Sequence, residues 1–374
     1  MVFAVVTGGG TSGHVIPAIA VIEALEDAGH PVGSLAYVGS RRGVESSLVP
    51  ATGVRCEFLP VSGLQRSFSL RSMLRNAVFP VRLLRSGSIA RRLAREMDPR
   101  VVVSVGGYAS EPMARAAVSL GIPLVCVSYD AFPGLATRRQ SRHAAACAVA
   151  FAGSDLPNAV VTGAPVRRAV RAMDRAAARD AARGSMGIDD GTLLVTVVGG
   201  SLGSRALNGA VPAIARALSS SGVRARIHHV TGPRNAPVDD AAGATPGVPG
   251  VETVTVAVET DMPGVLAATD VLVSRAGAST VAEIAAVGVA SVLVPWPGAA
   301  ANHQVSNARW LADAGAAVLV EETGALAGDL AERVVALARD ADLRGRLADA
   351  ARGLGAMNRG GSLVEVVEKA ARAH

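Results

Sequence analysis

The sequence predicts an α/β protein of two domains, each built on a doubly wound parallel sheet. The chain has 374 residues, which exceeds the usual size of one hydrophobic core. Short apolar runs alternate with stretches of helical periodicity. Both halves also begin alike, because the apolar runs 2–7 and 194–198 each lead into a glycine turn. We therefore expect two Rossmann-like domains whose parallel sheets face a central cleft.

The expected elements follow one another regularly along the chain. In the first half, helical stretches at 15–28 and 113–119 accompany strands expected at Val2–Thr7, Leu35–Val38, Val101–Val105, Pro123–Val127 and Ala148–Ala152. The strands expected in the second half are Leu194–Val198, Arg226–Val230, Val251–Val256, Val271–Val273 and Ser291–Val294. The charged stretch 167–184, which is helical in period, is interpreted as the linker region between the halves, and the tail 330–373 as helices with alternating charge.

Composition excludes several classes of protein. Half of the residues are hydrophobic and 18% are charged, which excludes a disordered chain. The three cysteines are widely spaced and favour buried thiols in a reducing compartment over disulfides or a metal site. The N-terminus lacks the features of a signal peptide, and no run of about 18 uninterrupted apolar residues is present. We expect a cytoplasmic protein.

The net charge of +6 is carried almost entirely by arginine. This excess either reflects an arginine- and alanine-rich residue usage or forms a basic face for phosphates or an anionic membrane. The segment Phe68–Arg95 mixes apolar residues with arginine. It is either an amphipathic helix pair packed on the sheet and broken at Pro80, or an interfacial helix that contacts anionic lipid. No RRM, zinc-finger or helix-turn-helix signature indicates nucleic acid.

The turn after the first expected strand has the pattern Gly8-x-Gly10-x-x-Gly13, which occurs in dinucleotide-binding proteins. Glycines let the backbone approach an anion, and the following helix offers free N–H groups. An NAD-dependent dehydrogenase needs an acidic residue after the second strand, where this chain has Arg41 and Arg42. Two arginines can hold a ribose 2′-phosphate, so an NADP-dependent oxidoreductase stays an alternative.

His14 opens the helix that follows this turn. The positive end of the helix dipole lowers the pKa of a histidine in this place, which favours a neutral general base. A capping or packing histidine is the structural alternative. Two further glycine turns, Gly106-Gly107-Tyr108 and Gly199-Gly200-Ser201, also follow expected strands. Three such turns at strand C-termini in two domains predict a phosphate-rich ligand.

Polar residues also lie where later strands meet helices. Ser279 and Thr280 can cap a helix or contact phosphate. Glu283, expected in the first turn or two, either complements the helix dipole or binds both hydroxyls of a ribose.

The segment His303-Gln304-x-x-Asn307 follows a Pro-Trp-Pro-Gly loop and offers amide groups, which suit sugar hydroxyls. The only Asp-x-Asp, at 340–342, lies in a charged helical region, so we predict no metal site.

In this order, the motifs resemble those of the MurG-type N-acetylglucosaminyltransferases of peptidoglycan synthesis. The likeness runs from about residue 5 to about residue 320. The matching stretches are 9–17 (Gly-Gly-Thr-Ser-Gly-His-Val-Ile-Pro), 43–50, 62–64, 106–110, 163–167, 199–201, 274–283 and 303–307.

The resemblance implies a GT-B fold. It implies an acceptor-binding domain at 1–163, a UDP-sugar-binding domain at 164–354, and a C-terminal helix, 355–374, that packs back on the first domain. The implied reaction transfers N-acetylglucosamine with inversion from UDP-N-acetylglucosamine to lipid I, which is undecaprenyl-diphosphoryl-N-acetylmuramoyl-pentapeptide. The product is lipid II, formed at the inner face of the membrane. Neither a cofactor nor a catalytic metal is implied.

The resemblance also implies roles for individual residues, with His14 as the base or as an organiser of the acceptor. The implied donor contacts are Arg167, Ser201, Ser279 and Thr280 at the phosphates, Glu283 at the ribose, Gln304 with the neighbouring His303 at the sugar, and the backbone of Val258 and Glu259 at uracil. The implied acceptor contacts are Gly10, Thr11, Ser12, Gly13, Gly106, Gly107 and Tyr108, with Thr11 near the diphosphate.

The chain departs from the family pattern after the strand expected at 123–127. The family usually has His-Glu-Gln-Asn where this chain has Val127-Ser128-Tyr129-Asp130. Asp130 therefore competes with His14 as the candidate base. The departure leaves two alternatives open: a related GT-B transferase with another glycolipid or natural-product acceptor, and a non-catalytic relative that binds a sugar nucleotide.

Overall fold

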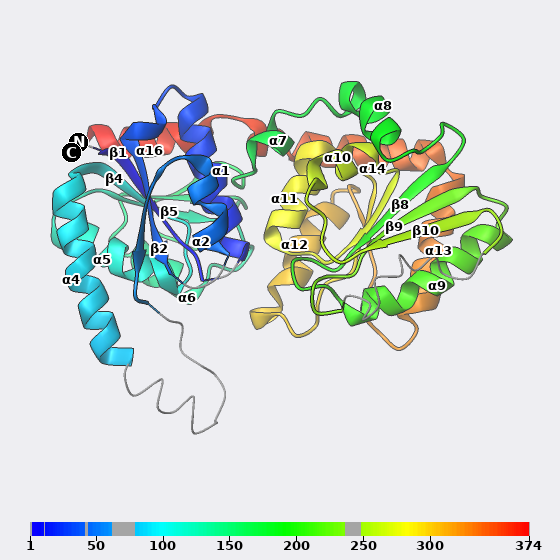
Figure 1. Ribbon diagram of the computed structural model, residues 1–374, viewed down its shortest axis with the longest axis horizontal. Helices are drawn as coiled ribbons and strands as arrows, with labels where there is room; N and C mark the ends of the chain where they lie inside the picture. Colours follow the sequence, from blue (N-terminus) through cyan, green and yellow to red (C-terminus); the bar gives the residue numbers. More distant parts are fainter. Residues whose placement is uncertain (1, 11, 42–43, 62–78, 236–247, 374) are drawn as a thin grey trace. The chain divides into compact units, whose positions relative to one another are not determined.

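The computed structural model describes residues 2–10, 12–41, 44–61, 79–235 and 248–373, with only the backbone of residues 12 and 79–84. The chain forms two compact units (Figure 1). The first contains Met1–Arg168 and Gly360–His374, and the second contains Ala169–Arg359. The sequence places the domain boundaries at 163/164 and 354/355.

The first unit is a seven-stranded parallel sheet covered by helices. Its strands, in sheet order, are β3 (Arg55–Leu59), β2 (Leu35–Ser40), β1 (Val2–Thr7), β4 (Pro99–Ser104), β5 (Leu124–Ser128), β6 (Ala146–Val149) and β7 (Ala159–Val161). Its helices are α1 (Ser12–Asp27), α2 (Glu45–Leu48), α4 (Phe79–Met97), α5 (Glu111–Ser119), α6 (Leu135–Ser141) and α16 (Ser362–Arg372). The strand order reverses between β1 and β4, and ligands of doubly wound sheets bind outside the carboxyl ends at such a point.

The second unit repeats this plan with six parallel strands. In sheet order they are β10 (Val251–Val256), β9 (Ala225–Val230), β8 (Leu193–Val198), β11 (Val271–Ser274), β12 (Ser291–Leu293) and β13 (Val318–Leu319). Its helices are α8 (Arg175–Ser185), α9 (Arg205–Ser220), α10 (Met262–Ala268), α11 (Ala278–Val287), α12 (His303–Ala312), α13 (Leu326–Arg339), α14 (Ala341–Leu354) and α15 (Ala356–Arg359), while the short α7 (Arg168–Arg171) lies at the boundary. The reversal here lies between β8 and β11.

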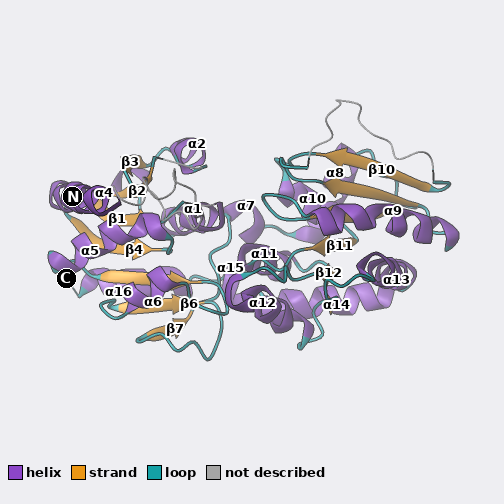
Figure 2. Ribbon diagram, turned by 90° about the horizontal axis from the view of Figure 1, so that it is seen from below, coloured by secondary structure: helices purple, strands orange, loops and turns teal. Residues whose placement is uncertain are grey.

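Both sheets are buried on their two faces, as parallel sheets require. In the second unit Val195 and Val197 of β8 pack against α9 and α13, while Leu194 packs on the opposite face with Ala268 of α10. Figure 2 shows helices on both sides of each sheet. The predicted α/β class is therefore confirmed, and the pattern of Val, Ala and Leu builds the cores.

The last helix, α16, belongs to the first unit. It contacts β4, β5 and β6 and lies beside α1. His30 Nε2 lies 3.1 Å from Glu368 Oε1 and joins the end of α1 to this helix. The helical tail expected at 330–373 is confirmed in the form of α13 to α16.

Three strands and the linker differ from the expectations. The strands β3, β7 and β13 escape sequence patterning because β3 is partly polar, β7 is exposed along its length, and β13 has only two residues. The helical period of 167–184 is confirmed by α8, but the interpretation as a linker is wrong for most of its length, because α8 packs on α10 of the second unit.

Part of the basic segment 68–95 can be compared with its two interpretations. Residues 68–78 lie outside the described residues, and α4 begins at Phe79 with Pro80 in its first turn, where proline is tolerated. Farther along α4, Ala90, Leu93 and Ala94 are buried against the core while the arginines are exposed. This part is an amphipathic helix packed on the unit. Among the described residues, no helix is long and apolar enough to cross a bilayer.

Candidate active site

The glycine turn after β1 is held by buried polar side chains. Gly9 and Gly10 have φ angles of 117° and 93°, which favour glycine. The carboxylate of buried Glu45 accepts the N–H of Gly10 at 2.9 Å, and the Tyr37 hydroxyl donates to the carbonyl of Gly8 at 2.9 Å. A Cβ on Gly10 would lie 2.2 Å from Cε1 of Tyr108, so glycine lets this ring approach the turn. These contacts hold the backbone of Gly8 to Gly10 in place.

His14 lies in the first turn of α1, beside this glycine turn. Its Nδ1 is 2.7 Å from the hydroxyl of Tyr129, which follows β5. The second glycine turn, after β4, surrounds the ring, because a Cβ on Gly107 would lie 2.8 Å from Cδ2 of His14 and 2.5 Å from the carbonyl oxygen of Gly9. Chain segments at the carboxyl ends of β1, β4 and β5 thus enclose one imidazole.

Burial lowers the pKa of His14 below its ordinary value. The negative charge of Asp130 and a backbone hydrogen bond to Val105 act in the opposite direction. The net result is a neutral imidazole at physiological pH, as a general base requires. Gly13 is exposed next to it, while Thr11 lies outside the described residues and only the backbone of Ser12 is described.

In the second unit the corresponding turn follows β8. A Cβ on Gly199 would lie 2.2 Å from the backbone nitrogen of Ser204, and one on Gly203 would lie 1.9 Å from the carbonyl oxygen of Thr231. The helix α9 begins directly after Ser204, whose side chain accepts the N–H of Leu207. Ser201 is exposed at the tip of the turn. Backbone N–H groups and a hydroxyl are therefore presented at a helix N-terminus, which suits an anion.

A buried arginine, Arg275, supports this turn. It donates through Nη2 to Ser204 Oγ at 2.7 Å and through Nη1 to the carbonyls of Val294 and Pro295 at 3.2 and 3.3 Å. Its Nη1 also lies 2.5 Å from Glu322 Oε2. One guanidinium thus connects the segments that follow β8, β11, β12 and β13. Sequence analysis passed over Arg275, although it lies inside the motif 274–283.

The helix α11 begins at Ala278, so Ser279 and Thr280 lie within its first turn. The N-cap is Gly277, which makes no side-chain cap bond, so the idea that Ser279 or Thr280 caps this helix is wrong. Both are half-buried, as is Glu283. Glu283 is the sixth residue of α11 and lies beyond the first turn, so it is not an N-terminal capping carboxylate.

The polar residues of α12 contact the loops at the carboxyl edge of the second sheet. Gln304 Oε1 accepts the N–H of Trp296 at 2.9 Å, His303 Nδ1 lies 2.7 Å from the carbonyl of Ala300, and buried Asn307 donates to the carbonyl of Ala276 at 3.2 Å. Asn307 thereby holds the turn that leads into α11.

The residues predicted near uracil lie after β10. Glu259 is engaged, because its Oε2 is 2.9 Å from His228 Nε2 and its Oε1 accepts the N–H of Asp261 at 2.7 Å. The Val258 side chain is 58% exposed.

Arg167 belongs to the first unit, whereas the other predicted donor contacts belong to the second. Its Nε donates to Glu23 Oε1 on α1 at 2.9 Å, and Nη2 is at the same distance. A role at the donor phosphates would require Arg167 to leave Glu23.

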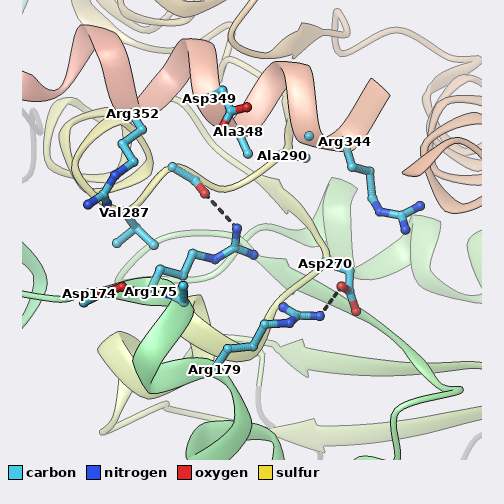
Figure 3. A pocket seen from close by; sticks show the side chains of 13 residues that line it. Asp174, Arg175, Arg179, Asp270, Val287, Ala290, Arg344, Ala348, Asp349 and Arg352 are labelled. Atoms are coloured by element: carbon cyan, nitrogen blue, oxygen red, sulfur yellow. Dashed lines mark hydrogen bonds and ion pairs between the residues drawn. The ribbon is translucent and has the colours of Figure 1, made fainter. Parts of the chain in front are cut away.

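An arginine-lined pocket of about 380 Å³ lies at the opposite, amino-terminal edge of the second sheet. Arg175 and Arg179 lie one turn apart on α8. Arg175 donates to the carbonyls of Gly288 and Thr269. Arg179 donates to the carbonyl of Ala268 and to the carboxylate of Asp270. In Figure 3 the guanidinium groups of Arg344 and Arg352 point to opposite ends of the pocket. The arginines do not converge on one point, so they do not form an anion-binding site. We interpret Arg175 and Arg179 as structural residues that attach α8 to the second unit.

Within the described ranges, no group of three or more His, Cys, Asp or Glu side chains could hold a metal ion. Asp340 of the only Asp-x-Asp is the N-cap of α14, where it accepts the N–H of Leu343 at 2.8 Å.

Comparison with known proteins agrees with this geometry. Residues 4–149 match the glycosyltransferase family 28 N-terminal domain, and residues 194–354 match the C-terminal domain of the same family. The chain is 35% identical, over 98% of both chains, to a protein of Desulforudis audaxviator named UDP-N-acetylglucosamine–N-acetylmuramyl-(pentapeptide) pyrophosphoryl-undecaprenol N-acetylglucosamine transferase. A protein of the same name from Paenarthrobacter aurescens is 37% identical over 99% of this chain and 96% of its own length.

Solved structures support the fold. The crystal structure of Acinetobacter baumannii MurG has a TM-score of 0.70 and 25% identity, and the alignment covers 98% of this chain and 99% of that one. The glycotransferase of kitacinnamycin has a TM-score of 0.65 at 17% identity over 98% of both chains, which speaks for the fold alone. The GT-B fold and the resemblance found in the motifs are thereby confirmed. The chain belongs to glycosyltransferase family 28.

Proposed function

We propose that this protein transfers N-acetylglucosamine from UDP-N-acetylglucosamine to lipid I and so forms lipid II for peptidoglycan. The observation that carries this proposal is the similarity, over nearly the whole chain, to transferases named for that donor and acceptor. The neutral His14 beside a glycine turn supplies the base that the reaction needs. The turn after β8 supplies anion-binding groups of the kind that a nucleoside diphosphate needs.

The proposed step is a displacement with inversion at C1 of the donor sugar. His14 takes the proton of the acceptor hydroxyl as its oxygen bonds to C1. The bond between C1 and the phosphate oxygen breaks, and UDP leaves with the bonding electrons. The N–H groups of the turn at 199–204 and the N-terminus of α11 stabilise the charge on the leaving diphosphate.

Contacts on the donor side are part of the proposal. Ser201, Ser279 and Thr280 face the diphosphate, and Glu283 binds the ribose hydroxyls. Gln304 and His303 border the sugar, and the backbone of Val258 and Glu259 binds uracil. Support comes from their positions after β8, β10, β11 and β12 of a single unit. We assign Arg167 to the diphosphate on the condition that its ion pair with Glu23 opens.

Contacts on the acceptor side lie in the first unit. The backbone of the two turns, at Gly10, Ser12, Gly13, Gly106 and Gly107, is assigned to the lipid-linked diphosphate together with Thr11 and the exposed edge of Tyr108. Asp130 is the second candidate for the base, because its charge acts on the same imidazole.

We also propose that the protein works at the cytoplasmic face of the membrane as a peripheral enzyme, since lipid I is membrane-bound. The basic segment 68–95 is the proposed contact with anionic lipid. Sedimentation with vesicles of phosphatidylglycerol, and of phosphatidylcholine for comparison, tests this contact. Equal binding to both would contradict it.

One assay tests the function. The full chain is given UDP-N-acetylglucosamine and a lipid I analogue, with and without EDTA, and release of UDP is followed. We expect turnover in both conditions. Turnover with another glycolipid and none with lipid I would favour the alternative acceptor, and binding of NADPH in place of UDP would contradict both transferase interpretations.

A further inference from the structure

The hydroxyl of Tyr129 lies between two groups at the N-terminus of α1. Its oxygen is 2.6 Å from the carbonyl oxygen of Gly13 and 2.7 Å from Nδ1 of His14. Both separations are those of short hydrogen bonds. The Tyr129 side chain is only 6% exposed, and its ring meets that of His14 edge to face with centroids 6.2 Å apart. The hydroxyl therefore has two fixed neighbours.

Counting protons decides which group donates to which. A carbonyl oxygen can only accept, so the single proton of Tyr129 goes to Gly13. The short contact with Nδ1 then needs a proton from the imidazole ring. A neutral imidazole carries one N–H, which this contact places on Nδ1, so Nε2 keeps its lone pair.

We propose that Tyr129 is a positioning residue that holds His14 in the Nδ1–H tautomer and makes Nε2 the basic atom. This inference rests on His14 being the base of the proposed function. The assignment of the tautomer can be tested without measuring catalysis.

Two further groups act on the ring, and one of them, the backbone at Val105, competes with Tyr129 for the single ring proton. The carboxylate of Asp130 and the backbone at Val105 are the groups that favour the charged imidazole, and burial opposes them. Burial, together with the nearby charge of Asp130, holds the pKa of Tyr129 well above its usual range, so its hydroxyl keeps the proton that it donates to Gly13. Tyr129 therefore acts as a neutral acceptor toward Nδ1.

A neutral acceptor has a consequence that a carboxylate would not have. A carboxylate bonded to Nδ1 orients a histidine but also stabilises its positive charge, which raises the pKa. The phenol oxygen orients the ring with a smaller effect of this kind. His14 can therefore be oriented and still remain unprotonated before the acceptor binds.

The test is the protonation pattern of the His14 ring, read by nitrogen NMR on the full chain labelled with ¹⁵N-histidine. The chain has seven histidines, so His14→Gln identifies the signals. We expect a protonated Nδ1 and an unprotonated Nε2 in the wild type. A wild-type ring protonated on Nε2 would overturn the inference, whatever the activity.

Two variants separate positioning from general damage to the fold. Tyr129→Phe removes the acceptor, so the Nδ1–H form no longer predominates and kcat falls roughly 10–100-fold, the range found for groups that orient metal-bound histidines. The KM for UDP-N-acetylglucosamine stays unchanged. Tyr37→Phe is the matched control, because it removes a hydroxyl that donates to the adjacent Gly8 carbonyl and leaves the His14 ring pattern intact.

Two outcomes complete the test. If Tyr129→Phe keeps the wild-type ring pattern, the inference is wrong. If the pattern changes as expected while His14→Ala stays active, the tautomer assignment stands and the choice of base in the proposed function fails.

Discussion

The two units each have a glycine turn at the point where strand order reverses, yet the turns are supported by different chemistry. The turn after β1 has a histidine beside it whose pKa burial lowers, and it is held by the buried side chains Glu45 and Tyr37. The turn after β8 leads into a serine cap held by the guanidinium of Arg275. The first arrangement contains a neutral imidazole that can accept a proton, and the second contains a permanently charged guanidinium that cannot.

This difference assigns separate tasks to two turns that occupy the same place in their sheets. A neutral imidazole suits proton transfer, because it can take the proton of the acceptor hydroxyl. A turn fixed by a permanent charge and presenting N–H groups suits a diphosphate, because its dipoles need no reorganisation when charge develops. Substitutions at the first turn should therefore change kcat and its pH dependence, whereas those at the second should change donor affinity and stability.

The largest effect is expected for His14→Ala. Loss of the base should lower kcat by roughly 10²–10⁴-fold, with little change in the KM for UDP-N-acetylglucosamine. Steady-state release of UDP measures both constants. A near-normal rate would transfer the role of base to Asp130, and Asp130→Asn would then show the loss.

Arg275→Met should be the most damaging change at the second turn. It leaves Glu322 and two carbonyls without their buried partner, and breaking such a pair costs about 3–5 kcal/mol of the free energy of unfolding. The variant that still folds should also bind the donor more weakly, because Ser204 loses its hydrogen bond from Arg275. Denaturant unfolding and titration with UDP measure the two effects.

A matched control for Arg275 is available in the same unit. Arg224→Met removes an ion pair to Asp189 in which both side chains are more than 60% exposed. Exposed pairs contribute about 0–1 kcal/mol. Equal losses from the two substitutions would show that Arg275 has no special role.

Two glycines of the second turn test its shape. Gly200 and Gly203 have φ angles of 82° and 77°, so alanine at either position should cost about 1–2 kcal/mol of stability. A Cβ on Gly203 would also lie 1.9 Å from the carbonyl of Thr231, while one on Gly200 meets open space. Gly203→Ala should therefore raise the donor KM more than Gly200→Ala. The opposite order would place the ligand directly over Gly200.

Sequence reasoning predicted the strand-and-turn plan because apolar runs and glycines leave local signals. It also predicted His14 and the glycine turns at 8–13, 106–107 and 199–201. It missed Glu45, Tyr129 and Arg275 as supports, since their partners are 35, 115 and 71 residues away. Contacts at such separations leave no periodic pattern. Tyr129 was visible only as a departure from the family motif.

Capping and linker assignments failed for a related reason. Ser279 and Thr280 are good capping residues by type, but α11 begins one residue before Ser279 and uses Gly277. The stretch 167–184 is charged like a linker, yet its arginines at 175 and 179 donate to backbone carbonyls of the second unit. Composition shows that a residue is polar, but only the fold shows which backbone carbonyls its side chain bonds to.

The smallest expected effect is a displacement of the pH profile by Asp130→Asn. His14 must be neutral to accept a proton, so kcat/KM falls as pH decreases through its pKa, which burial places below about 6.5. The charge of Asp130 raises that pKa, so its removal should move the acidic limb to lower pH. His229 does not interfere, because burial lowers its pKa to about 4. Asp155→Asn, which removes an exposed carboxylate paired with Arg138 in the same unit, should leave the limb in place. A limb that moves to higher pH in Asp130→Asn would mean that His14 is not the group being titrated. The assignment of proton transfer to the first turn would then be wrong.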